Sequence, residues 1–260
     1  MKRAVLSIMA GAWALAAAGC GGSQKDVTAY LNDLLFPPST AERVVQVESR
    51  LADNRREALQ KIAKDKKARR IESVVKLYCL VARTDKDPMV RAAAVRGLAD
   101  MQGDPVVPAL AHVLAADKDA FVRTDAAASL ARHDDPLAME TLVDALKSDA
   151  SADVRIAAAE SLRAFRDKRA AEALAAATEY RDLGVAYNAW LSLRYMTGQD
   201  LPRQTAPWTE FLAASADPFA DYGDPPRLPK GESQRPQFTT GIGDFFRGLF
   251  AKDPLEAELE

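Results

Sequence analysis

The sequence predicts an all-α fold, an α-solenoid of about four to five helical hairpins, and two observations support that prediction. The pair Val-Arg recurs at residues 90–91, 122–123 and 154–155, so the repeat length is 32 residues. Alanine supplies 50 of the 260 residues and aromatic residues only 7%, a composition that favours helices over sheets. Two short helices cannot bury their apolar sides alone, so repeated hairpins are expected to stack around one continuous core.

Each repeat carries residues that start a helix and give it an apolar side. Four residues can accept hydrogen bonds from the first-turn N–H groups of a helix, namely Asp87, Asp119, Ser151 and Asp182. Three prolines are expected at the first helical position, where a missing N–H costs nothing: Pro88, Pro105 and Pro136. One apolar stripe consists of Val122, Ala126, Ala127 and Leu130. These patterns place the repeat region at 53–196.

Residues 1–19 have the pattern of an export signal. Their apolar run at 4–18 is shorter than the roughly 20 residues needed to span a bilayer. The run ends in small residues directly before Cys20 and resembles the lipobox of bacterial lipoproteins, in which the cysteine receives a diacylglyceryl group and becomes the N-terminus. The resemblance implies lipid attachment at Cys20 and a tether at 20–25, although Ala17 stands where that family prefers Leu. The other interpretation is an ordinary signal peptide that leaves Cys20 as a free thiol.

The charge of the chain excludes one class of partner. A formal net charge of −2 argues against nucleic acid as the main partner, because phosphate binding needs a surplus of Lys and Arg. One local surplus exists at residues 53–76, which contain nine basic and four acidic side chains. This surplus fits either an anionic docking strip, for lipid headgroups or an acidic partner, or a solvated helix face.

The repeat unit at 87–98, Asp-Pro-x-Val-Arg-x-Ala-Ala-x-x-x-Leu, resembles short HEAT repeats of the kind named after phycobilisome lyases, and the resemblance is clear over 85–196. In that family, Asp and Arg at such positions form a ladder of ion pairs between successive repeats. The resemblance therefore implies structural roles for three arginines: Arg91, Arg123 and Arg155. Ala186 replaces the arginine in the next unit, so the ladder is expected to end there.

Two segments flank the repeats directly. Residues 26–52 are expected to form an N-terminal helical segment. Residues 197–214 are expected to form a cap helix, which resembles the Trp-bearing cap of many bacterial HEAT proteins. Its aromatic residues and Trp190 either seal the last repeat from water or form a ligand box.

The remaining residues, 215–260, contain six Pro, nine acidic and five basic residues, a composition typical of disorder. Within this tail, the amphipathic segment 241–251 places five apolar residues on one helical face: Ile242, Phe245, Phe246, Leu249 and Phe250. An isolated helix of this length is marginal in water, so the segment is expected to dock. The solenoid's own groove, a partner protein and a membrane are the three candidate docking surfaces.

Catalytic and metal-binding patterns are missing from the sequence. His112 and His133 are the only histidines and neither is followed by Glu, whereas HEAT-type metal hydroxylases build a di-iron centre from His-Glu pairs. Cys79 lies in an apolar helical run and is expected to be a core residue rather than a nucleophile. We therefore expect no cofactor and no enzymatic activity.

Together these features predict a membrane-anchored HEAT-repeat scaffold that binds an unknown protein partner in the bacterial cell envelope. Acyl chains on Cys20 would hold the exported protein at the cell membrane or the outer membrane, facing the periplasm. The alternative is a chromophore-lyase-like enzyme or accessory protein, which would bind a tetrapyrrole. A structural spacer without a specific partner is the third interpretation.

Overall fold

The computed structural model describes residues 39–223, and this part of the chain is all-α. It contains eleven α-helices and one short 3-10 turn, at Ala68–Arg70. The helices are α3 (Thr40–Gln46), α4 (Ala52–Lys64), α5 (Glu72–Thr84), α6 (Pro88–Leu98), α7 (Val106–Ala116), α8 (Ala120–Leu130), α9 (Pro136–Ser148), α10 (Ala152–Leu162), α11 (Lys168–Ala177), α12 (Leu183–Thr197) and α13 (Thr205–Ala214).

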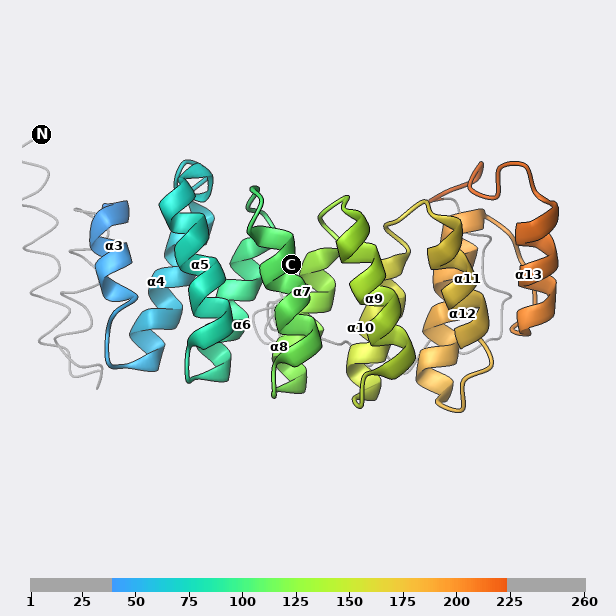
Figure 1. Ribbon diagram of the computed structural model, residues 1–260, viewed down its shortest axis with the longest axis horizontal. Helices are drawn as coiled ribbons and strands as arrows, with labels where there is room; N and C mark the ends of the chain where they lie inside the picture. The colour runs from blue at the N-terminus through green and yellow to red at the C-terminus, as the bar shows by residue number, and fades with distance from the viewer. Residues whose placement is uncertain (1–38, 224–260) are drawn as a thin grey trace, which may run out of the picture.

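The helices form hairpins that stack in a single row (Figure 1). The hairpins are α3–α4, α5–α6, α7–α8, α9–α10 and α11–α12, and α13 closes the row by packing against α11. Each first helix, from α5 onward, contacts the first helix of the next hairpin, and the second helices α4, α6, α8, α10 and α12 contact one another in the same way. The predicted α-solenoid of four to five hairpins is therefore confirmed.

One apolar core runs through all the hairpins. The stripe predicted on one helix is fully buried, and its members now belong to α8: Val122, Ala126, Ala127 and Leu130. Equivalent positions of the neighbouring second helices are also fully buried, at Val90, Val154 and Val185. Because many of the facing residues are alanines, neighbouring helices can approach closely. Stacking of this kind explains how helices of 10 to 15 residues remain stable.

Most of the predicted helix starts are found, and two differ. The side chains of Asp87, Asp119 and Asp182 accept N–H hydrogen bonds at the starts of α6, α8 and α12. Ser151 makes no such bond, although its own N–H donates to Asp149 Oδ1 at 2.8 Å, just as the N–H groups of Asp87 and Asp119 donate to the aspartates two residues before them. Pro105 precedes the first turn of α7, since the Gly103 carbonyl accepts a hydrogen bond from Val106 N–H and delays the helix.

The C-terminal end differs from the predicted tail boundary at residue 215. Residues 215–223 form turns that pack back onto the last hairpin, with Phe219 and Tyr222 against the core. Tyr222 Oη donates to the Arg163 carbonyl at 2.9 Å, and Gly223 N–H donates to the Tyr195 carbonyl at 2.9 Å. The physical cause is that two aromatic side chains of this segment, Phe219 and Tyr222, are half-buried against the core, which composition alone does not reveal.

Candidate functional site: the ladder edge, the open face and the hollow edge

The turns that join the first helix of each hairpin to its second helix define one edge of the solenoid, which we call the ladder edge. Arg91 Nε and Nη2 donate to the two carboxylate oxygens of Asp117 at 2.7 and 2.8 Å, and Nη1 donates to the Asp85 carbonyl at 2.9 Å. Arg123 repeats this geometry with Asp149, at 2.8 Å for both bonds, and with the Asp117 carbonyl. Each guanidinium therefore fastens its own turn to the turn of the next hairpin.

The surroundings of the ladder aspartates favour the ionised form of each carboxyl group. Burial alone raises the pKa of Asp117, but the hydrogen bond from Arg91 and the N–H of Asp119 outweigh burial, so the net pKa lies below its ordinary value. Asp85 and Asp149 show the same lowered pKa for the same reasons. These charges are paired and hydrogen-bonded, which suits a structural role.

At its N-terminal start, the ladder has one more ion pair than the sequence predicted. At its C-terminal end, the last ion pair is longer than the others. Arg55, which the repeat pattern did not reveal, donates to Asp85 with Nε and Nη2, both at 2.8 Å. Arg155 approaches Asp182 only at 3.5 Å, because Arg181 stands one period after Asp149 and the partner is displaced by one residue. Ala186 is buried in α12 and provides no further arginine.

The outward sides of the second helices form a second surface, which we call the open face. On α8 the core-facing stripe lies opposite Phe121, Thr124 and Ala128, because residues three or four apart share a helix side. The equivalent outward positions of α6, α10 and α12 are Met89, Arg96, Asp153, Ile156, Glu160, Gly184, Tyr187 and Leu191, whereas Ala92, at the position that corresponds to Thr124, is buried. Only three of the eleven accessible residues are charged, so the open face is mainly apolar.

The open face is ordered by contacts between neighbouring helices. Arg96 of α6 pairs with Asp125 of α8, and its guanidinium lies 5.9 Å from the centre of the Phe121 ring. Farther along, the ring of Tyr187 lies 5.7 Å from that of Trp190. Phe121, Ile156 and Tyr187 are half-buried against the core. Their side chains are therefore held in place while one side of each remains accessible to a partner.

The outer side of the first helices is different. Its exposed residues include many ionised ones, for example Glu72 and Lys76 on α5, Glu140 on α9, and Glu172 on α11. These charged, exposed side chains favour hydration, and the exposed apolar residues beside them, Leu80 on α5 and Leu137 on α9, are isolated. The contrast between the two sides makes the open face the better candidate for recognition of a partner.

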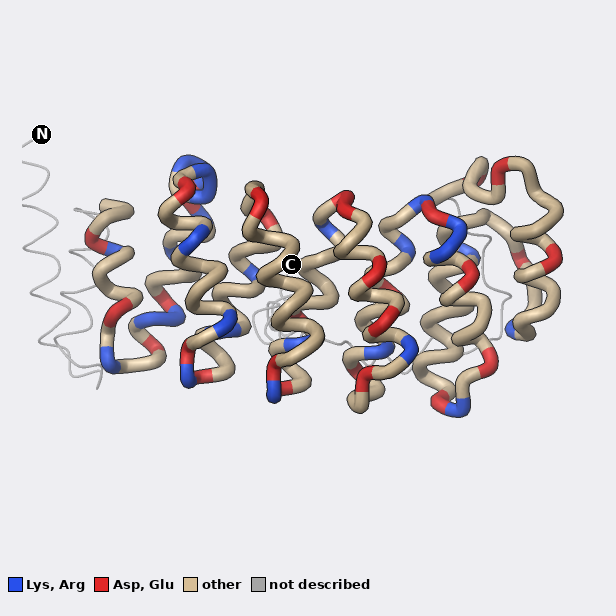
Figure 2. Tube along the Cα trace, viewed as in Figure 1, with Lys and Arg blue, Asp and Glu red and all other residues tan. Residues whose placement is uncertain are grey.

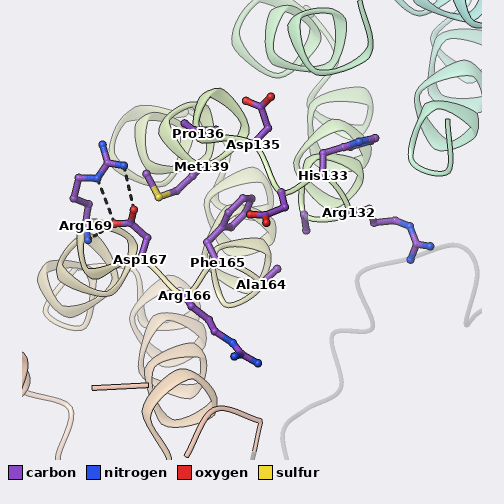
Figure 3. A pocket seen from close by; sticks show the side chains of 12 residues that line it. Arg132, His133, Asp135, Pro136, Met139, Ala164, Phe165, Arg166, Asp167 and Arg169 are labelled. Carbon is purple, nitrogen blue, oxygen red and sulfur yellow. Dashed lines mark hydrogen bonds and ion pairs between the residues drawn. The ribbon is translucent and has the colours of Figure 1, made fainter. Parts of the chain in front are cut away.

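The turns that join successive hairpins define the opposite edge, which we call the hollow edge. A hollow of about 550 Å³ lies between the α8–α9 and α10–α11 turns. Figure 3 shows the side chains that line it, among them Met139, Phe165 and several charged residues. Three of these are basic and three acidic, namely Arg132, Arg166, Arg169, Asp134, Asp135 and Asp167. Asp167 and Arg169 are paired with each other, at 3.1 Å. This hollow is therefore electrically balanced.

His133 lies in the α8–α9 turn, and its imidazole is buried. Its side-chain exposure is only 6%, and Nε2 has no hydrogen-bond partner within residues 39–223. Burial lowers the pKa of His133. The residues one period before and after it, Met101 and Phe165, are buried apolar side chains. His133 thus occupies an apolar position between repeats.

Several predicted sites lie elsewhere or outside the described residues. Cys20 and the tail residues Ile242, Phe245, Phe246, Leu249 and Phe250 lie outside residues 39–223. Cys79 is buried in α5, and burial raises the pKa of its thiol, which disfavours the reactive thiolate. Among residues 39–223, no group of His, Cys, Asp and Glu side chains could hold a metal ion. None of the helices described there is long and apolar enough to cross a membrane.

The stacked hairpins, the 32-residue period and the ladder define the class of an α-solenoid repeat protein. The family model of HEAT repeats matches residues 42–131 and 139–220, which is most of the chain, and the chain belongs to this family. No curated protein matches it. Among solved structures, it is similar to the crystal structure of an engineered protein, with 21% identity and a TM-score of 0.41, over 60% of this chain and 78% of that one.

Proposed function

We propose that this HEAT-repeat protein is a scaffold without enzymatic activity, which binds a partner protein on the open face and is held at a bacterial membrane by acyl chains on Cys20. The observation that supports binding is the open face itself. It presents half-buried apolar and aromatic side chains on four neighbouring helices, whereas the opposite side of the solenoid carries more charged residues and only isolated exposed apolar ones, such as Leu80 and Leu137. A partner with an apolar ridge would remove this surface from water.

The open face also fits a protein better than a small molecule. Its apolar residues are spread over α6, α8, α10 and α12 instead of lining one enclosed pocket. Small-molecule sites bury most of the ligand in a concave pocket, whereas protein interfaces extend over many residues and enrich aromatic side chains. Tyr187 and Phe121 are the expected anchors of such an interface.

Photo-crosslinking in cells tests the binding site by position. A photoreactive amino acid at residue 124 or 187 is expected to join the chain to the same partner, because both positions lie on the open face. The same amino acid at residue 172, on the exposed outer side of α11, is the matched control and should give no such product. Ile156→Lys should abolish the product, with helical content by circular dichroism as the folding control. Crosslinking from residue 172 alone would contradict the proposal.

The membrane anchor requires a separate test. Mass spectrometry of the mature protein should find a 241-residue chain that begins at a diacylglyceryl-modified Cys20. The variant Cys20→Ser should move from the membrane fraction to the soluble fraction. An unmodified N-terminus at or near residue 19 would contradict the anchor and indicate an ordinary signal peptide.

We also propose that the Phe-rich segment 241–251 docks the partner. A chain that ends after Gly223 should then yield less of the crosslinked partner than the full-length chain. Truncation after Gly223 is preferable to truncation after Ala214, because Phe219 and Tyr222 pack against the last hairpin. Equal recovery would assign docking to the solenoid alone.

A further inference from the structure

Basic side chains gather at the turn between α4 and α5. Lys64, Lys66, Lys67, Arg69 and Arg70 stand within seven residues, and Figure 2 shows this turn as the densest basic region at the upper edge of the solenoid. Asp65 is the one acidic residue among them. Its carboxylate accepts hydrogen bonds from the N–H groups of Lys67 and Ala68, at 2.8 and 3.3 Å. The Asp65 carboxylate therefore stabilises the backbone of the turn, and most of the basic side chains around it are not neutralised by it.

Part of this charge lines a hollow of about 450 Å³ between the α4–α5 and α6–α7 turns. The lining includes four basic residues and one acidic residue: Lys66, Arg69, Arg70, Arg132 and Asp100. Asp100 is already paired, with Arg69 at 2.8 Å and with Arg132 at 2.7 Å. Lys66 and Arg70 are exposed and have no acidic partner within residues 39–223. Two cations in this hollow are thus available to an anion.

The neighbouring hollows of the same edge do not share this charge. The next one, between the α6–α7 and α8–α9 turns, is lined by Asp104, Asp134, Asp135 and a single arginine. The third, shown in Figure 3, is balanced between three arginines and three aspartates. The surplus of positive charge in the first hollow is therefore not shared by these two hollows, although the α10–α11 turn also carries four exposed basic residues: Arg163, Arg166, Lys168 and Arg169.

The position of the basic hollow relates it to the chain before residue 39. Thr40 Oγ1 donates to Asp65 Oδ2 at 3.4 Å, so the described chain begins beside the basic turn. Cys20 stands only 19 residues before Ser39. Even a fully extended chain of this length spans at most about 65 Å. A lipid on Cys20 would therefore hold the N-terminal end of the solenoid within reach of the membrane surface.

We propose that the hollow between the α4–α5 and α6–α7 turns binds the phosphate of an anionic lipid headgroup through Lys66 and Arg70. Ammonium and guanidinium groups form charge-assisted hydrogen bonds with phosphate oxygens, and a planar guanidinium can use two of its N–H groups at once. The contact would orient the solenoid with its N-terminal end against the bilayer. The proposal rests on the lipid anchor for its biological setting, but the contact itself needs no acyl chain.

Vesicle binding by a chain without the anchor separates the two proposals. The mature chain, residues 20–260, carrying Cys20→Ser is mixed with vesicles of phosphatidylglycerol and phosphatidylcholine, or of phosphatidylcholine alone, and sedimented. We expect binding to the anionic vesicles only. Lys66→Gln with Arg70→Gln should weaken it roughly 25-fold, since each basic residue near an anionic surface contributes about fivefold. Because this readout does not use Cys20, it remains valid even if the cysteine is never lipidated.

The control is a double variant with the same change of charge on the ladder edge, Lys86→Gln with Lys118→Gln. Both side chains are exposed there, and binding should fall less than about threefold. Equal loss in both double variants, or equal binding to neutral vesicles, would overturn the proposal. Binding of inorganic phosphate or of a polyglutamate peptide without binding to anionic vesicles would also overturn it, and would assign the hollow to a soluble phosphate or to an acidic protein segment.

Discussion

Arg91 and Asp117 form the most enclosed step of the ladder, with side-chain exposures of 5% and 6%. Arg91→Ala would leave a buried carboxylate without its main partner, and we expect the free energy of unfolding to fall by about 3–5 kcal/mol. The matched control is Arg169→Ala, whose 60% exposed side chain pairs with Glu140 and Asp167, and which should cost less than about 1 kcal/mol. Urea unfolding of both variants measures the difference, and equal losses would contradict a structural ladder.

His133 gives a prediction that depends on pH. Because burial lowers the pKa of His133 in the folded protein, the unfolded chain binds the proton more readily. The contribution of His133 to stability is therefore lost as pH falls through the ordinary histidine value of about 6.5. The charged groups near the imidazole are Arg132, Asp135 and Asp100.

His133→Met, which copies Met101 one period earlier, should therefore stabilise the protein by about 1 kcal/mol at pH 7.5, because it removes an unpaired buried nitrogen. The gain should increase at pH 5.5. Thermal unfolding at the two pH values measures it. A gain that does not change with pH would show that His133 titrates normally.

At the residue scale, the sequence predicted part of the ladder. Arg91, Arg123 and Arg155 follow a repeated Val and were therefore recognisable. Arg55 follows Asn54 in a helix whose start has no capping side chain, so its repeat has no recognisable motif. The partner aspartates stand in the turns two residues before a helix cap, where sequence alone does not distinguish them from ordinary turn residues.

At the scale of elements, the contact between α5 and α6 decides whether the substitution Gly97→Ala stabilises or destabilises the protein. Gly97 lies in α6, and a Cβ atom there would meet the ring of Tyr78, a fully buried side chain of α5 that donates a hydrogen bond to the Leu59 carbonyl. Helix propensity alone predicts that Gly97→Ala raises the free energy of unfolding by about 1 kcal/mol. We expect the free energy of unfolding to fall by about 1–3 kcal/mol instead, because the added methyl group would overpack the contact with Tyr78.

The same substitution in a Tyr78→Leu background provides the control, because the shorter side chain leaves room for the added methyl group. There Gly97→Ala should cost much less. A stabilising effect of Gly97→Ala in the parent protein, measured by urea unfolding, would contradict close packing of this hairpin.

The C-terminal turns after α13 provide a second test of an element. A chain that ends at Ala214 lacks Phe219 and Tyr222, and we expect it to melt about 4–8 °C below a chain that ends at Gly223. Each truncated chain retains all the helices from α3 to α13. Equal melting temperatures would show that residues 215–223 add nothing to the last hairpin.

Helix positions were largely predictable because capping aspartates and apolar stripes are local signals. Pro88 and Pro136 begin their helices as predicted. Pro105 differs because the N–H of Val106 donates to the Gly103 carbonyl, a hydrogen bond that the sequence pattern does not show, whereas nothing in the structure explains why Ser151 makes no capping bond. The open face was not predictable, because it depends on which side of each second helix the neighbouring hairpins leave uncovered.

At the scale of the whole molecule, the hairpins within residues 39–223 pack mainly against their immediate neighbours, so this part of the protein is nearly one-dimensional. The open face extends along this dimension, the ladder fastens one edge, and a hollow with a surplus of basic residues lies at the N-terminal end of the other edge. A partner that binds the open face would meet side chains whose spacing is fixed by the repeat. The function proposed here therefore depends on a regular register between hairpins.

Distances between spin labels measure that register most directly. Residues 86, 118, 150 and 181 lie in successive turns of the ladder edge and are exposed, so labels there should not disturb the core. Neighbouring helices pack about 10 Å apart, so we expect about 20 Å for the pairs 86–150 and 118–181 and about 30 Å for 86–181. Clearly unequal separations for the two shorter pairs, or a long separation that does not exceed them, would contradict a solenoid of equivalent stacked hairpins.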